Sequence, residues 1–112
     1  MRYIVLIAIF IFSPFSNAGA YSNWAVPTTV ELVKNGVLIH GAFGDPNGCG
    51  KEGFVFVSQT DSSYDSVLSI SLAALMAKKE LRIYSSKCTG VGFHWPGEVI
   101  NEYIGSQAFF IH

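Results

Sequence analysis

Residues 28–41 read TTVELVKNGVLIHG and carry the strongest local structural signal in the sequence. Two runs of β-branched and aliphatic residues flank Asn35-Gly36, a dipeptide that tolerates positive φ at both central positions of a type I′ turn. The segment therefore predicts a β-hairpin. Counting outward from the turn predicts these cross-strand pairs: Lys34 with Val37, Val33 with Leu38, Leu32 with Ile39, and Glu31 with His40. Both faces carry apolar residues near the turn, as expected if each face is covered.

The next segment, residues 44–53 (GDPNGCGKEG), is a glycine-rich loop that carries Cys49. Its Gly-Lys pair is similar to the end of a phosphate-binding loop. However, the spacing from Gly44 is one residue too long, Glu52 stands where Ser or Thr should hold magnesium, and no helix follows. We therefore interpret the loop as a disulfide-bearing turn. Residues 54–60 then alternate in polarity, as in a strand.

Residues 62–79 are predicted to form the one helix, with Ser62 and Asp65 at its start resembling a capping box. Apolar side chains occupy nearly the whole circumference of this helix. In a small domain this pattern predicts burial on two sides, one against the sheet and the other against a second copy of the same helix. The oligomer interface is expected at Val67, Ile70, Ala74 and Ala77.

Further short strands are predicted over residues 81–85, 99–104 and 108–111. With the hairpin and residues 54–60 they make six strands, and the helix lies between the third and the fourth. This order predicts an α+β domain, mainly β, in the form of a small OB-type, partly open barrel of five to six strands.

The N-terminus has the three parts of a secretory signal: Met1 and Arg2, an apolar run over residues 3–12, and small polar residues up to Ala20. The run is too short to span a bilayer, which needs roughly 20 residues. Cleavage fits after Ala18 or after Ala20, and we prefer Ala20. Residues 1–20 are then a cleaved signal peptide, residues 21–112 form a single domain, and the protein is secreted or periplasmic.

The mature chain would have 92 residues (112 minus 20) and a net charge of 6 minus 8, or −2. This charge favours neither nucleic acid nor anionic lipid as a partner. The only two cysteines, Cys49 and Cys88, are expected to form one disulfide in an oxidising compartment, and two free thiols are the disfavoured alternative. Closing this loop would stabilise the domain by about 4 kcal/mol.

No residue set amounts to an active site, so we expect a protein that is not an enzyme and needs no cofactor. The three histidines, His40, His94 and His112, lack the spacing of a zinc site, and His40 is instead expected to pair with Glu31 across the hairpin. No serine lies in a nucleophile elbow. A hydrolase that combines a serine with His94 is the least favoured interpretation, because no third residue is visible to orient the histidine.

Aromatic residues are more numerous than loops and edge strands need, and exposed rings beside polar groups suit a sugar or a partner's apolar patch. The candidate ligand-binding residues are Tyr84, Phe93, His94 and Trp95. For any one of these residues, ordinary packing in the core is the alternative.

From Ser63 onward, the text SYDSVLSISLAALMAKKELRIYSSKC, with a cysteine-bearing loop upstream and short strands downstream, resembles the B subunits of subtilase cytotoxin and, more distantly, of pertussis-like toxins. The resemblance covers roughly residues 30–111. It implies an OB-type fold, a ring of five subunits assembled around the helices, and binding of cell-surface glycans. This chain is shorter, and no glycan-pocket residue of the family is carried over.

We therefore expect an exported, non-enzymatic binding module that is oligomeric and recognises a glycan or a partner protein. The alternative is an exported structural or regulatory protein that binds another protein through a sheet edge or the helix, without glycan recognition.

Overall fold

The computed structural model describes residues 19–92, 94–105 and 108–112, and within them the chain forms eight strands and one helix. In chain order the elements are β1 (Ala20–Tyr21), β2 (Thr29–Val33), β3 (Gly36–His40), β4 (Phe54–Ser58), α1 (Tyr64–Ala77), β5 (Leu81–Ser85), β6 (Lys87–Gly90), β7 (Val99–Glu102) and β8 (Phe109–Ile111).

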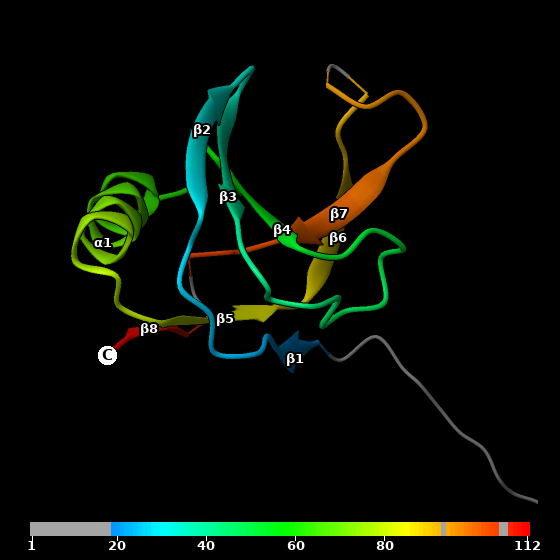
Figure 1. Ribbon diagram of the computed structural model, residues 1–112. Coiled ribbons are helices and arrows are strands. Elements are labelled where there is room, and N and C mark those ends of the chain that lie inside the picture. Colours follow the sequence, from blue (N-terminus) through cyan, green and yellow to red (C-terminus); the bar gives the residue numbers. More distant parts are fainter. Residues whose placement is uncertain (1–18, 93, 106–107) are drawn as a thin grey trace, which may run out of the picture.

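The strands build two sheets. Five strands pair in the order β2-β3-β4-β7-β6, with β4 and β7 parallel and every other pair antiparallel. The remaining three pair in the order β1-β5-β8. Figure 1 shows this smaller sheet at the bottom of the view, away from the β2–β3 turn and the segment that joins β6 to β7. The helix α1 packs against β2, β4 and β8.

The predicted hairpin is present as β2 and β3, but its turn lies one residue earlier than predicted, which shifts the cross-strand pairing by two residues. Val33 pairs with Gly36 and Glu31 pairs with Leu38, so Lys34 and Asn35 form the turn. Of these two residues, only Asn35 has a positive φ, 71°. Gly36 is instead the first residue of β3. This position needs a glycine because a Cβ would collide with the carbonyl oxygen of Val57 and the ring of Phe56.

The five-stranded sheet is buried on both faces, as its two-sided apolar pattern predicts. Alternate residues of β3 and β4, such as Val37 and Val57, face the main core with the helix and the small sheet. The intervening residues, Leu38 and Phe56, pack on the other face with Val91 from the segment after β6. The central strands are therefore held from two sides.

The helix differs from the prediction at its start. Ser63, not Ser62, is the N-cap residue, and it makes no side-chain capping hydrogen bond. The carboxylate of Asp61 instead accepts hydrogen bonds from the Ser63 backbone N–H and hydroxyl and from the Gly105 N–H. The predicted capping box is therefore wrong. The Asp61 carboxylate, upstream of the helix, holds the N-cap residue Ser63 and also binds the loop that contains Gly105.

The structure confirms an α+β, mainly β fold and the disulfide between Cys49 and Cys88. The helix lies between the fourth and fifth strands rather than the third and fourth, because β1 was not predicted. That strand is defined by its pairing with β5, where Ala20 pairs with Ser85. It has only two residues, which is too short for a polarity pattern that would reveal a strand in the sequence. No helix among the described residues is long and apolar enough to cross a membrane.

Candidate functional site

The structure describes three of the four predicted ligand-binding residues and divides them between two surfaces. His94 and Trp95 lie in the segment after β6, on the outer side of the five-stranded sheet. Tyr84 lies on β5, on the outer face of the three-stranded sheet, where its ring contacts Tyr21. Phe93 lies outside the described residues. The four residues therefore do not form one site.

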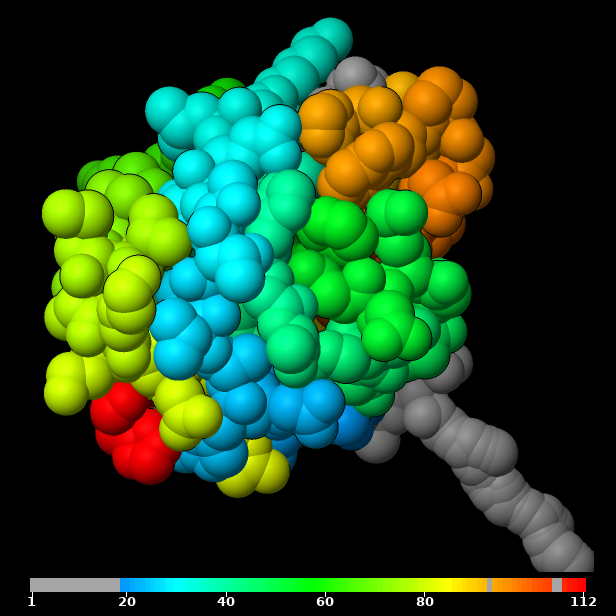
Figure 2. All heavy atoms as spheres, in the orientation of Figure 1, coloured from blue at the N-terminus to red at the C-terminus, as the bar shows by residue number. Residues whose placement is uncertain are grey.

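His94 and Trp95 belong to a group that combines aromatic and charged side chains, and we call it the Glu31 cluster. Its members come from β2, β3, β4, the loop between β3 and β4, and the segment after β6. They are Glu31, His40, Lys51, Phe54, His94 and Trp95. Figure 2 shows that the segment after β6 (orange) abuts the region of β3 and the following loop (green).

Glu31 is the polar centre of this cluster. Its Oε1 lies 2.9 Å from His40 Nε2, and its Oε2 lies 3.3 Å from His94 Nε2. The predicted contact between Glu31 and His40 is therefore present, although the two residues are diagonal rather than directly opposite in the ladder. One carboxylate thus ties the β2–β3 hairpin to the segment after β6.

Aromatic rings form the other half of the cluster. The ring of Trp95 lies 4.7 Å from Phe54 and 4.3 Å from His94, measured between centroids. Lys51 places its ammonium group 4.8 Å from the Trp95 ring and 5.3 Å from the Phe54 ring, within the range of cation–π attraction. Trp95 is only half-buried, so an indole surface lies beside an imidazole and an ammonium group, and the His94 imidazole contacts the Glu31 carboxylate.

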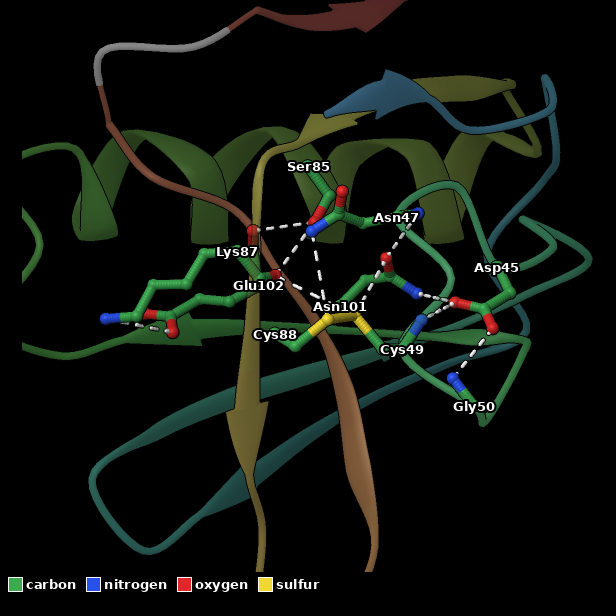
Figure 3. The surroundings of a disulfide bond; sticks show 9 residues. All are labelled: Asp45, Asn47, Cys49, Gly50, Ser85, Lys87, Cys88, Asn101 and Glu102. Carbon is green, nitrogen blue, oxygen red and sulfur yellow. Dashed lines mark hydrogen bonds and ion pairs between the residues drawn. A yellow bond between two sulfur atoms is a disulfide. The ribbon is translucent and has the colours of Figure 1, made fainter. Parts of the chain in front are cut away.

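The disulfide fixes the loop that carries Lys51. Cys49, two residues before Lys51, is bonded to Cys88 of β6, with 5.5 Å between the Cα atoms. Figure 3 shows how Asp45 and Asn101 hold the same loop. Asn101 is fully buried on β7; its side-chain amide donates to Asp45, and its oxygen accepts from the Asn47 backbone N–H. The loop is therefore held in place by the disulfide and by these hydrogen bonds.

The carboxylate of Asp45 is committed to this architecture. Burial alone would raise its pKa, but hydrogen bonds from the Gly50 backbone, the Asn101 side chain and the Cys49 backbone together hold the pKa below its ordinary value. These donors occupy both oxygens, at 2.8 Å each. The Asp45 carboxylate thus binds groups of its own loop and of β7, in agreement with the interpretation of residues 44–53 as a disulfide-bearing turn.

Glu102 lies on β7, where burial raises the pKa of its carboxyl despite the opposing effects of Lys87, 3.8 Å away, and Thr89. A raised folded-state pKa gives stability that is full below the unfolded value and is lost as pH rises through the folded value. We expect Glu102→Gln to remove this loss and raise the unfolding free energy at pH 7 by about 1 kcal/mol or less.

Urea unfolding of Glu102→Gln between pH 4 and pH 8 checks this expectation. The exposed Glu98→Gln is the matched control, and it should follow the wild-type pH profile. A Glu102→Gln protein that loses stability relative to wild type as pH rises would contradict the assigned sign.

Most of the residues predicted for an oligomer interface are buried within the domain itself. Val67 and Ala74 are buried, and Ile70 packs against the same core. Only Ala77 is exposed. The apolar side chains that α1 leaves to solvent are chiefly Leu72 (44% exposed) and Met76 (81%). The helix covers its own sheet with residues that the sequence had assigned to a second copy.

The sequence did not single out Lys51 and Phe54, since a loop lysine and a strand phenylalanine carry no signal of their own. It also missed a second surface, the Arg82 face, which consists of Tyr21, Trp24, Arg82, Tyr84 and Phe110. The alternation in LRIYS did place Arg82 and Tyr84 on one side of the strand, and the structure confirms this because Leu81, Ile83 and Ser85 are the buried positions.

In the described part of the chain, no three His, Cys, Asp or Glu side chains are arranged to hold a metal ion. No family model matches the chain, and neither a curated protein nor a solved structure shows significant similarity to it.

Proposed function

We propose that the protein is an exported, non-enzymatic binding module that recognises a glycan through the Glu31 cluster. The observation that carries the proposal is the half-buried Trp95 ring, which lies beside Lys51 and His94, and His94 in turn contacts the carboxylate of Glu31. This combination supplies both kinds of contact that a sugar needs.

The apolar C–H face of a pyranose packs on an aromatic ring, while its hydroxyl groups exchange hydrogen bonds with charged side chains, which are stronger partners than neutral ones. Glu31 accepts hydrogen bonds, Lys51 donates them, and a histidine does either according to its protonation state. Because no single element supplies the whole cluster, a ligand at this site would touch residues from several segments at once.

Preorganisation supports the same proposal. The cluster is built on β2, β3 and β4, and the loop with Lys51 is fixed by the disulfide. A ligand that binds there orders few side chains, which lowers the entropic cost of binding. No enclosed pocket exists among the described residues, so the ligand would lie on the surface.

Export is part of the proposal and rests on the three-part N-terminal sequence and on the disulfide, which is expected in an oxidising compartment. Of the two cleavage frames, the one after Ala18 would keep the whole of β1, because Ala20 pairs with Ser85. The OB-type barrel and the resemblance to toxin B subunits stay predictions in agreement with this function.

A glycan array probed with the oxidised, exported protein tests the function. We expect selective binding of a small set of glycans, weakened about tenfold or more in Trp95→Ala and Glu31→Gln, which corresponds to about 1.4 kcal/mol. Trp24→Ala, on the other surface, is the matched control and should bind as wild type does. Absence of binding to any glycan, or equal binding by Trp95→Ala, would count against the proposal.

The second candidate is a protein-binding role without glycan recognition, favoured by the exposure of Leu72 and Met76 on α1. These two side chains would also lie between subunits if copies of the chain assemble around their helices. Light scattering separates the cases. A mass near five subunits supports a toxin-like ring, whereas a monomer supports binding of a different protein through Leu72 and Met76.

A further inference from the structure

The Arg82 face carries an inference that is independent of the Glu31 cluster. The face is the outer side of the β1-β5-β8 sheet, with Trp24 added from the segment that follows β1. Tyr21 is 44% exposed, Trp24 37% and Phe110 42%. Their rings are in mutual contact, with centroids 5.9 Å apart for Tyr21 and Phe110 and 6.2 Å apart for Trp24 and Phe110. The face is therefore a continuous aromatic patch.

Arg82 lies in this patch without an anionic partner. Its Cζ is 4.5 Å from the centroid of the Tyr21 ring and 6.0 Å from that of Trp24. No ion pair joins it to a described residue, and its Nε, which is buried, has no hydrogen-bond partner among those residues. The guanidinium group is thus held in place by rings and left unneutralised.

The other titratable groups near this face, Glu80 and His112, form no ion pair with Arg82. Glu80, which precedes β5, is engaged by His112, with 3.1 Å between Oε1 and Nε2. His112 itself stacks against Trp24, with ring centroids 4.1 Å apart. The charged and titratable groups described at the face are therefore a hydrogen-bonded Glu80–His112 pair and one cation, Arg82, without an ion-pair partner among the described residues.

We infer that the Arg82 face is a docking surface for a partner protein that presents an aspartate or glutamate beside apolar side chains. A guanidinium group binds a carboxylate through two parallel hydrogen bonds, which its two terminal Nη groups can donate where Nε is buried. Tyrosine, tryptophan and arginine are also the residues that dominate the energetics of protein interfaces.

An unpaired cation among exposed rings favours a partner protein over a neutral sugar, because it suits a carboxylate with apolar side chains around it. Arg82 covers the Tyr21 ring, and His112 packs on Trp24. Aromatic rings are electron-rich on their faces and electron-poor at their edges. A patch that presents a guanidinium group among exposed rings attracts an anion surrounded by apolar groups.

Selection of a displayed random-peptide library on the oxidised protein tests the inference. We expect the selected peptides to be enriched in Asp or Glu next to aromatic or aliphatic residues. They should bind Arg82→Gln about tenfold or more weakly and Arg82→Lys with an intermediate loss, since lysine keeps the charge but not the fork. Thermal unfolding and circular dichroism of both variants verify that they fold.

Two control variants locate the effect. Lys34→Gln removes an exposed cation elsewhere, and Trp95→Ala alters the Glu31 cluster; both should bind the selected peptides as wild type does. Peptides without acidic residues, or equal binding by Arg82→Gln, would overturn the inference. Failure to select any peptide, together with binding of polyglucuronate that Arg82→Gln abolishes, would overturn it in favour of an acidic glycan.

Discussion

Removal of the disulfide in the double variant Cys49→Ala/Cys88→Ala is expected to lower the unfolding free energy by about 4 kcal/mol, because the bond closes a long loop in the unfolded chain. The sequence separation of the two cysteines is 39 residues. A loss of this size is a large part of the stability of a small domain, which is typically ~5–15 kcal/mol. Urea unfolding of the oxidised wild type and of the variant measures the difference.

The same variant should also loosen the Glu31 cluster, since the disulfide fixes the loop that carries Lys51. Wild type reduced with a thiol is the control, and it should unfold at the same urea concentration as the double variant. A difference of less than about 1 kcal/mol between oxidised wild type and variant would show that the Asp45 and Asn101 hydrogen bonds hold the loop without the bond.

Replacement of Gly36 by alanine is expected to cost about 3 kcal/mol, because its Cβ would meet the backbone of the neighbouring strand. The nearest atoms are the Val57 carbonyl oxygen and the Phe56 ring, whose Cζ would lie 2.7 Å away. Backbone conformation is not the cause, since Gly36 has no positive φ. Thermal and urea unfolding measure the loss.

Gly90→Ala is the matched control, because Gly90 lies at the end of β6 with nothing within 4 Å of an added Cβ and no positive φ. Its substitution should be neutral or stabilising by up to about 1 kcal/mol, since alanine restricts the unfolded chain. If Gly36→Ala were as stable as Gly90→Ala, the close approach of β3 and β4 would not be a real constraint.

The hairpin shows how far the sequence could predict the fold. The two runs of β-branched and aliphatic residues and the Asn-Gly pair predicted that both strands form and pair as a hairpin, because they report local conformation and burial. They did not predict the register, which depends on the close contact between Gly36 and β4, a strand about twenty residues away. The strands β1 and β6 were missed for a related reason: each is short and is defined by its partner, β5 and β7 respectively.

The candidate site was predicted in part. His94 and Trp95 do lie together beside charged groups, whereas Tyr84 belongs to a different surface and Phe93 lies outside the described residues. The separation follows from the two-sheet topology, in which β5 pairs with β1 and β8 rather than with β6 and β7. Sequence order placed Tyr84 near His94, but the chain changes sheets between β5 and β6.

The proposed ligand contact is tested most directly through the fluorescence of single tryptophans, because the chain has only Trp24 and Trp95. Trp24→Phe leaves Trp95 as the sole reporter, and Trp95→Phe leaves Trp24. Titration with a glycan selected on the array should change the emission of Trp24→Phe in a saturable manner and leave that of Trp95→Phe unchanged. A saturable change in Trp95→Phe alone would place the glycan at the Arg82 face and contradict recognition through the Glu31 cluster.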